Sequence, residues 1–350
     1  GGWDSWQDGN QGGPAPTSTR AENLELTYVK RKEWRIGLEG SLLNRMITFD
    51  INYFNQKTDG LITTGEATLY PSFFTGRGSF LPNTNFNADK RSGIDFDIHF
   101  NKKFGQVEAS LGVVGMYYTT KADKRDELWA NDYQYRAGHS LSTAWGYECE
   151  GFFNSQEEID NHATQTFGVV RPGDLKYKDQ NNDGVIDSKD QVDLGKSVAP
   201  FFYGVNLELK WKNFTFFALA TGQAGGIAFK NNSYYCPTGT SKYSVYALDR
   251  WTPATASTAS YPRLTTTDNA NNTQTSSFWK YSTNRFDLTK VQVTYDMPQQ
   301  WFEGKFVKGL SVYLNGESLL TISGEREIME TVIGAMPQCR FYNLGVKVNL

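Results

Sequence analysis

The residues whose types and spacing suggest chemistry lie in one twelve-residue segment, Asp179 to Asp190, with the sequence DQNNDGVIDSKD. Oxygen donors occur at positions 1, 3, 5, 7, 9 and 12, as in a calcium loop, with a backbone carbonyl at the seventh. The predicted ligands are Asp179, Asn181, Asp183, Val185, Asp187 and Asp190. Gly184 is sixth, where a positive φ turns the chain around the ion. The pattern predicts a structural Ca²⁺, and the alternative is a solvated Asn/Asp/Gly turn without an ion.

The segments on either side of this loop look extended. Leu175 to Lys178 precedes it, Gln191 to Gly195 follows it, and Pro172-Gly173 interrupts the chain further upstream. An EF-hand needs an amphipathic helix on each side. The sequence therefore predicts a metal-stapled loop and not a calcium sensor, with weakened affinity because Asp190 stands where a longer Glu is usual.

Enzyme chemistry and nucleic-acid binding have little support in the sequence. The three histidines lie in no nucleophile or metal motif, and the three cysteines form no closely spaced pair. Asp95, Asp97 and His99 alternate with apolar residues, for which we favour the lining of a barrel interior over acid–base catalysis. The net charge of −3 gives no sign of a nucleic-acid partner. We expect a protein that is not an enzyme.

Aromatic residues gather in and beside a long insertion at 222–284. Six of them are candidate substrate contacts: Tyr234, Tyr235, Tyr243, Tyr246, Trp251 and Trp279. Aromatic faces near Asn and Asp suit sugars, which offer apolar ring faces and hydroxyls. The same residues could instead pack the loop onto itself or onto a lid protein, because interfaces also favour Tyr and Trp. The sequence leaves both interpretations open.

The elements that must position these residues are strands, because period-two alternation recurs along the chain. Tyr203 to Trp211 and Tyr342 to Leu350 are examples, and a change of phase within Phe286 to Tyr295 predicts a bulge. Short connections at 44–45, 103–106 and 212–213 and a moderate one at 297–308 alternate with longer ones at 64–91, 121–200, 222–284 and 323–338. About nine spanning strands result if Ser140 to Phe153 belongs to the insertion at 121–200.

This alternation of short and long connections predicts an all-β transmembrane antiparallel barrel with long extracellular loops. A soluble β-sandwich explains the alternation equally well, but not the asymmetry of the connections or the charged residues along one face. No run of eighteen apolar residues is present, as expected for strands that alternate. Single-chain bacterial barrels have an even number of strands. About nine strands therefore predict that residues 1–350 are the C-terminal portion of a longer barrel, held in outer-membrane lipid.

Several segments, in their order, resemble SusC/RagA-type TonB-dependent outer-membrane transporters of Bacteroidetes. The strand-turn-strand from Glu33 to Leu61, the strand KRSGIDFDI and the segment YECEGFFNSQEEID from Tyr147 to Asp160 are similar to family segments. So are RWTP from Arg250, YPRL from Tyr261 and LNGESLL from Leu314. The most similar is PGDLKYKDQNNDGVIDSKDQVDLG, which contains the predicted metal loop.

The resemblance implies a function and partners that the residues alone do not. It implies a twenty-two-stranded barrel whose first strands and plug precede Gly1, energised through TonB. It also implies a SusD-like surface lipoprotein as a lid, and import of nutrient oligomers, glycans or peptides. The alternative from a different class is a secreted β-rich glycan-binding or adhesion module stabilised by Ca²⁺.

Overall fold

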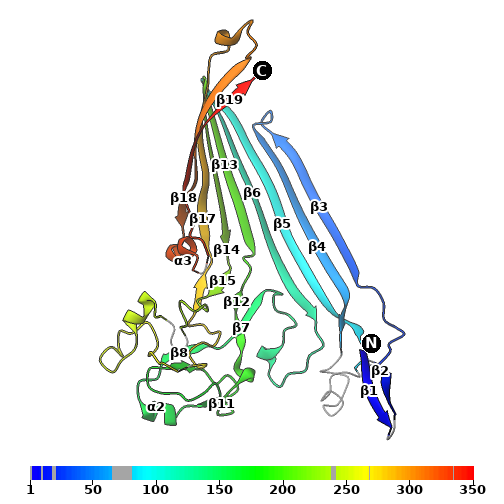
Figure 1. Cartoon of the computed structure of the whole chain (residues 1–350). Coiled ribbons are helices and arrows are strands. Elements are labelled where there is room, and N and C mark those ends of the chain that lie inside the picture. The colour runs from blue at the N-terminus through cyan, green and yellow to red at the C-terminus, as the bar shows by residue number, and fades with distance from the viewer. Residues whose placement is uncertain are drawn as a thin grey trace. The chain divides into compact units, whose positions relative to one another are not determined.

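The chain is described by a computed structural model that covers residues 2–8, 11–17, 21–64, 81–237, 242–267, 269–333 and 335–350. Within these ranges, nine strands form one antiparallel sheet in the order β19-β18-β17-β14-β13-β6-β5-β4-β3 (Figure 1). The strands are β3 (Lys30–Leu42), β4 (Ile47–Thr63), β5 (Thr84–Phe104), β6 (Val107–Lys124), β13 (Phe201–Trp211), β14 (Phe214–Ala224), β17 (Arg285–Asp296), β18 (Gly309–Ile322) and β19 (Phe341–Asn349). The predicted number of spanning strands and the predicted alternation of short and long connections are confirmed.

Short elements make up the remainder. Two-stranded pairs join β1 (Gly2–Asp8) with β2 (Gln11–Thr17), β7 (Thr143–Gly146) with β12 (Val192–Lys196), β8 (Cys149–Phe152) with β10 (Leu175–Tyr177), β9 (Thr164–Gln165) with β11 (Val185–Ile186), and β15 (Ile227–Phe229) with β16 (Lys280–Ser282). The α-helices are α2 (Gln156–Asp160) and α3 (Arg326–Thr331), and the 3₁₀ turns are η1 (Asp132–Gln134), η2 (Ser188–Asp190), η3 (Val245–Asp249) and η4 (Gln299–Phe302). No helix in the described ranges is long and apolar enough to cross a membrane.

Strands β4, β5 and β6 are longer than the sequence predicts. Of the polar segment expected at 64–91, residues 65–80 lie outside the described part of the chain, and the last part, from Thr84, already belongs to β5. Hydrophobic alternation marks only the part of a strand that faces apolar surroundings, whereas backbone pairing continues beyond it. The bulge predicted in β17 is confirmed, because the register shifts between Leu288 and Lys290 against β18.

The chain divides into two compact units. The first is Gly1–Arg35, Phe54–Ser92 and Thr119–Leu141. It contains outer segments of β3 to β6, with ion pairs such as Lys57 to Asp59 at 2.9 Å. The second is Ile36–Tyr53, Gly93–Tyr118 and Ser142–Leu350, and it contains the rest of the sheet and most of the two insertions. The insertion predicted at 121–200 is thus divided between the units at Leu141.

In the second unit the sheet has one apolar face. Residues directly opposite each other in antiparallel strands share a face. The register places one row of apolar side chains across six strands: Ala109, Leu209, Phe216, Val293, Leu314 and Leu344. Leu314 is 56% and Leu344 76% exposed. An apolar face that open matches the lipid-facing surface of a barrel.

The other face of the same strands is polar. The neighbouring row in the register is Ser110, Glu208, Phe217, Gln292, Asn315 and Asn343. Asn343 Nδ2 donates to Asn315 Oδ1 at 3.0 Å, and Lys210 Nζ lies 2.8 Å from Glu208 Oε1. A polar row beside an apolar row is typical of strands between a lumen and lipid.

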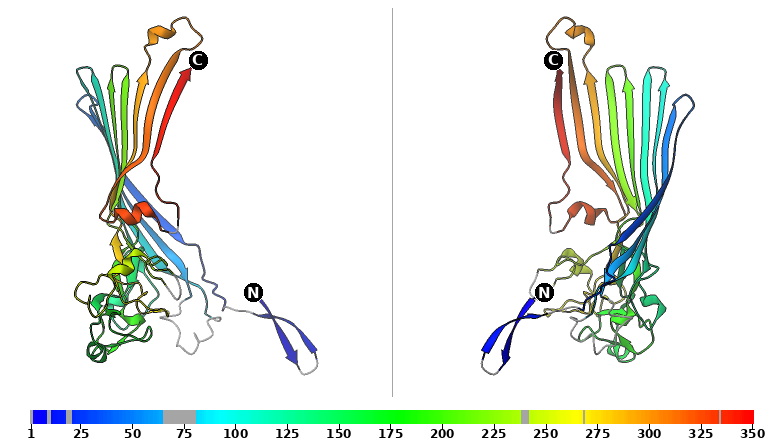
Figure 2. Two further views of the ribbon diagram at one scale, coloured as in Figure 1. Left: turned by 60° about the vertical axis from the view of Figure 1, so that its left-hand side comes forward. Right: turned by 90° about the vertical axis from the view of Figure 1, so that its right-hand side faces the viewer.

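Glycines on these strands make room for rings on the neighbouring strand. A Cβ on Gly222 would lie 2.3 Å from the Tyr203 ring, and one on Gly345 would lie 2.3 Å from the Tyr313 ring. Aromatic rings laid over glycines of a neighbouring strand help to pin the register of twisted sheets. The short turns and the end of β19 lie at one end of this unit, and the folded insertions at the other (Figure 2).

Candidate functional site

The two insertions of the second unit fold into one body with a shared core. Its buried members are Tyr147, Leu175, Tyr177, Ile186, Tyr235, Tyr261 and Trp279. The first four come from the insertion at 121–200 and the last three from that at 222–284. Backbone bonds join the same segments, with Tyr147 N donating to Thr275 O and Ser277 N to Tyr147 O, both at 2.9 Å. The functional loops are therefore one ordered structure.

Buried amides tie strand β10 to the second insertion. Asn271 Nδ2 donates to Leu175 O at 2.9 Å, and Tyr177 OH donates to Asn271 O at 2.6 Å. Gln165 Nε2 bonds Leu175 O at 3.0 Å, while Gln165 Oε1 accepts from Tyr177 N at 2.7 Å. Such bonds satisfy buried polar groups that would otherwise be costly. This network fixes β10, and with it the start of the predicted metal loop.

Asp174 joins the two insertions, and no motif in the sequence marks it as a site. Its side chain is 0% exposed and lies 2.8 Å from Arg263 Nε. Oδ1 also accepts from Asn269 Nδ2 and Asn272 Nδ2, each at 2.8 Å, and Oδ2 accepts from Arg171 N at 2.8 Å. A buried carboxylate with this many donors replaces its lost hydration fully. The sequence feature that could have drawn attention to Asp174 is its place in the segment PGDL, directly before the apolar Leu175.

Two glycines permit the close approach of the insertions. A Cβ on Gly146 would lie 2.3 Å from the carbonyl oxygen of Thr275. Gly173 has a φ of +91°, and the Trp251 indole packs against it. A Cβ added at Gly173 would lie 2.4 Å from the indole ring. The segments PGD and RWTP, which are distant in sequence, therefore meet at this glycine.

The predicted aromatic substrate contacts divide into two groups. Tyr235, Trp251 and Trp279 are 4%, 7% and 5% exposed. Side chains buried to this degree pack the insertion and cannot offer a ring face to a ligand from solution. A cavity of 30 Å³ beside Tyr261 and Trp279 has room for little more than water. These three residues pack the insertion onto itself, which is the alternative to substrate contact that the sequence left open.

The other three lie nearer the surface. Tyr234 and Tyr246 contact the Tyr235 ring, with centroids 5.2 Å away in each case, and are half-buried. Tyr243 is exposed, and its hydroxyl donates to Thr265 O at 2.9 Å. Substrate contact by these residues stays a prediction.

The predicted metal loop is a compact turn closed by its own carboxylates. Asp179 Oδ2 accepts from Gly184 N at 2.9 Å, and Asp183 Oδ1 accepts from Val185 N at 2.9 Å. Gly184 has a φ of +82°, as predicted for its position. The N–H of Val185, followed by the Asn181 amide, lowers the pKa of Asp183. The loop is therefore held in a form that favours the ionised side chain of Asp183.

Other contacts in this loop differ from those of calcium ligands. Asp190 is fully buried, and its two oxygens accept from Gln180 N and Asp187 N, each at 2.9 Å. Lys189 Nζ lies 3.4 Å from Asp183 Oδ2. Within the described residues, no three acidic, histidine or cysteine side chains form a group that could hold a metal ion. Ca²⁺ binding remains a prediction.

Two thiols lie against the same core. Burial raises the pKa of Cys149 to about 11 and that of Cys236 to about 12. Burial also raises the pKa of Tyr177 well above its ordinary value. These groups are neutral at physiological pH, so the core carries no reactive thiolate.

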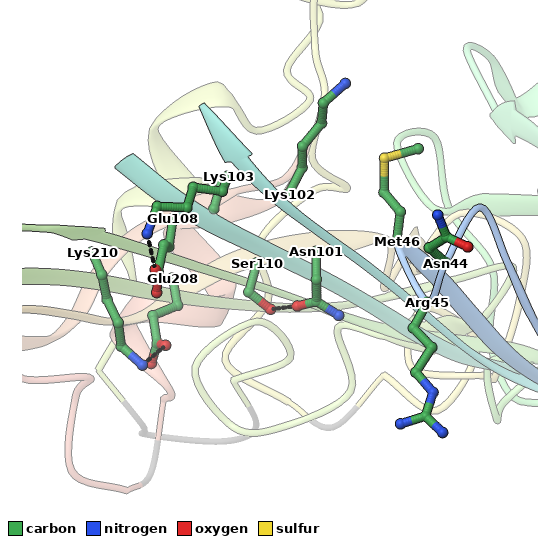
Figure 3. Close-up of a pocket in the computed structure, with 11 residues that line it drawn as sticks. Asn44, Arg45, Met46, Asn101, Lys102, Lys103, Glu108, Ser110, Glu208 and Lys210 are labelled. Carbon is green, nitrogen blue, oxygen red and sulfur yellow. Dashed lines mark hydrogen bonds and ion pairs between the residues drawn. The ribbon is translucent and has the colours of Figure 1, made fainter. Parts of the chain in front are cut away.

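The polar face of the sheet has an open cavity of 590 Å³ near the short turns. Figure 3 shows two ion pairs among its lining residues, Lys103 Nζ to Glu108 Oε1 and Lys210 Nζ to Glu208 Oε1, both at 2.8 Å. On the same face, His99 Nε2 lies 2.8 Å from Asp97 Oδ1. Paired charges along an open face fit a barrel lining, as the sequence predicted for Asp97 and His99.

Comparison with known proteins gives matches along most of the chain, although no family model matches. TonB-dependent receptor P26 of Formosa agariphila is 29% identical over 332 residues, which are 89% of this chain and 32% of that protein. TonB-dependent receptor SusC of Bacteroides thetaiotaomicron is 25% identical over 219 residues, covering 56% of this chain and 19% of that protein. Both relatives are named as receptors, in agreement with the prediction of a protein that is not an enzyme.

Solved structures show the same fold. The RagAB peptide importer in its open-open state matches with a TM-score of 0.73 at 15% identity, over 100% of this chain and 37% of that chain. The RagAB peptide transporter matches with a TM-score of 0.71 at 16% identity, over 99% of this chain and 38% of that chain. The chain thus spans less than two fifths of each relative. The resemblance to SusC/RagA-type TonB-dependent transporters is confirmed, and the chain corresponds to the C-terminal portion of their outer-membrane β-barrel.

Proposed function

We propose that this chain belongs to a TonB-dependent transporter that imports nutrient oligomers, glycans or peptides, across the outer membrane. The observation that carries the proposal is the two-faced sheet, whose apolar row is open on one side and whose polar row lies on the other. A secreted adhesion module would leave that apolar face in water, at a cost of roughly 25 cal/mol for each Å². Transport through a polar interior requires both faces.

The proposal includes three partners. Within the described ranges β3 and β19 are the edge strands of the sheet, and because an edge strand leaves backbone groups unpaired in a bilayer, they would need the remaining strands of the barrel. An upstream plug coupled to TonB would supply the energy for import. A SusD-like lipoprotein would cover the folded insertions as a lid, and the similar RagAB structures are those of a peptide importer.

Uptake by cells tests this function. Cells with and without the intact protein are given labelled oligosaccharide pools and labelled peptide pools, with and without a protonophore that collapses the energy supply to TonB. We expect accumulation of one pool that needs both the protein and the energy supply. Energy-independent accumulation would reject active import but leave the barrel intact, and binding without accumulation would favour an adhesion module.

We also propose that the Asp179–Asp190 loop binds a structural Ca²⁺. Oxygen donors of this kind are those that Ca²⁺ prefers, and four aspartates against Lys189 leave the loop with excess negative charge. Asp179, Asn181, Asp183, Asp187 and the Val185 carbonyl would hold the ion once Lys189 moves away, with Asp190 bracing the loop from beneath. Calorimetry with Ca²⁺ and Mg²⁺ tests this, and an absence of heat with both ions would refute it.

A further inference from the structure

A row of aromatic side chains lies at the short-turn end of the apolar face. The register places Val107, Trp211, Phe214, Tyr295 and Val312 directly opposite one another on successive strands. Phe214 packs on both neighbours, with ring centroids 6.3 Å from Trp211 and 4.8 Å from Tyr295. Strand β5 ends at Phe104 and β6 begins at Val107, so the two-residue turn between them places Phe104 opposite Val107 and extends the row to β5. Trp211, Phe214 and Phe104 are 48%, 44% and 54% exposed.

This row marks the edge of the apolar band. Strand β13 runs eleven residues from Phe201 to Trp211, with Tyr117 opposite Phe201 at its other end. Ten steps of about 3.3 Å, tilted by roughly 40°, span about 25 Å, the height of the apolar band of an outer-membrane barrel. Trp211 and Phe214 therefore stand at the depth of lipid headgroups.

Two lysines lie over rings of this row. Lys102 Nζ is 5.3 Å from the Phe104 ring centroid, and Lys212 Nζ is 5.2 Å from that of Trp211. Neither has a carboxylate partner within the described part of the chain. Lys102 is among the residues at the polar-face cavity, but Figure 3 shows its side chain pointing away from the Lys103–Glu108 pair. Both ammonium groups therefore have N–H donors that can bind an anion at the boundary of the membrane.

We propose that Lys102 and Lys212, with the rings of Phe104 and Trp211, form a binding site for the phosphate of an anionic phospholipid. The two rings lie two strand spacings apart, about 10 Å, which is the scale of one headgroup. The acyl chains would cover the apolar row while the ammonium groups contact the phosphate. This inference concerns the lipid around the barrel and is independent of what the barrel imports.

Native mass spectrometry of the intact transporter tests the site. The protein is released from detergent with phosphatidylglycerol or with phosphatidylcholine of the same acyl chains. We expect preferential retention of phosphatidylglycerol, and a loss of about fivefold for each lysine in Lys102→Gln and Lys212→Gln. The matched control is Lys103→Gln, the adjacent residue on the polar face, which should leave retention unchanged.

Two results would overturn the proposal. One is equal retention of the two lipids by the unsubstituted protein. The other is phosphatidylglycerol retention that is unchanged in the Lys102→Gln/Lys212→Gln variant. Heat-modifiable gel mobility establishes that each variant is a folded barrel, so a misfolded variant is not counted in either direction. Uptake assays on the same proteins keep failure of this site distinct from failure of transport.

Discussion

At the scale of single residues, Asp174 decides whether the insertions stay joined. It is buried with the Arg263 guanidinium, two asparagine amides and a backbone N–H around it. Removing its charge leaves the Arg263 guanidinium, whose side chain is 19% exposed, without this counterion. Loss of one partner of a fully buried pair costs about 3–5 kcal/mol, and the partial exposure of Arg263 reduces that cost.

We therefore expect Asp174→Asn to make the insertions several-fold more sensitive to limited proteolysis, with the barrel still folded. Asp160→Asn is the matched control, because Asp160 is an exposed carboxylate in the same insertion that accepts a 2.8 Å bond from Gln156 Nε2. Equal protease resistance of Asp174→Asn and the unsubstituted protein would contradict the role of Asp174 in joining the insertions.

The thiols provide a second prediction at this scale. Cys149 and Cys236 are buried with pKa values raised to about 11 and about 12, whereas Cys339 is exposed. At pH 8, below both raised values, neither buried group has an appreciable thiolate fraction. A maleimide should label Cys339 rapidly and the other two at least tenfold more slowly, as read by peptide mass spectrometry. Denatured protein, in which all three react alike, is the control.

At the scale of elements, the contact between β7 and the second insertion depends on Gly146. A Cβ there would lie 2.3 Å from the backbone oxygen of Thr275, and backbone cannot move as a flexible side chain does. Gly146→Ala should lower the melting temperature of the insertion by several degrees, consistent with about 1–3 kcal/mol of overpacking. Gly324→Ala, which meets open space, should leave it unchanged. Unchanged melting of Gly146→Ala would mean that the two insertions can separate freely.

Turn η3 presents apolar side chains outward. Val245 is 61% and Leu248 77% exposed, while Ala247 between them is buried. If the proposed lid lipoprotein covers the insertions, Leu248→Asp should reduce its co-purification several-fold without loss of barrel folding. Val169→Asp, an equally exposed apolar site on the first insertion at 79%, tests whether the effect is local to η3. Undiminished co-purification in both variants would exclude these surfaces from the lid contact.

The sequence predicted the strands well because local alternation reports which side of a strand is apolar. The strand that contains Trp34, Ile36 and Leu38 can be predicted from its own alternation, without knowing which strands lie beside it. The short turns between strands are predicted from equally local sequence. The partners of Asp174 could not be predicted in the same way. Arg263 and Asn272 are 89 and 98 residues away, and nothing in their own segments indicates which carboxylate they will meet.

The aromatic residues show the same limit. Tyr235 and Trp279 have the composition of a sugar site and also that of a core, and only the fold decides between them. Burial at 4% and 5% placed both in the core. Likewise, alternation places Trp211 at the end of a strand, but its stack with Phe214 depends on the cross-strand register, which local sequence does not specify.

At the scale of the whole molecule, a transmembrane barrel requires one face of each strand to meet lipid and the other to meet water. On β13 the register assigns Leu207 and Leu209 to the apolar face and Asn206 and Glu208 to the polar face. A secreted module would place both faces in water or in a protein core. The alternation of environments along this strand therefore distinguishes the two classes directly.

The most direct test is the accessibility of single spin labels at 206, 207, 208 and 209 in the intact protein reconstituted into lipid vesicles. Collisions with oxygen, which concentrates in lipid, and with a water-soluble nickel chelate are measured for each label. We predict that oxygen dominates at 207 and 209 and the nickel chelate at 206 and 208. Equal accessibility at all four positions, or protein that stays in buffer without entering vesicles, would contradict a transmembrane barrel.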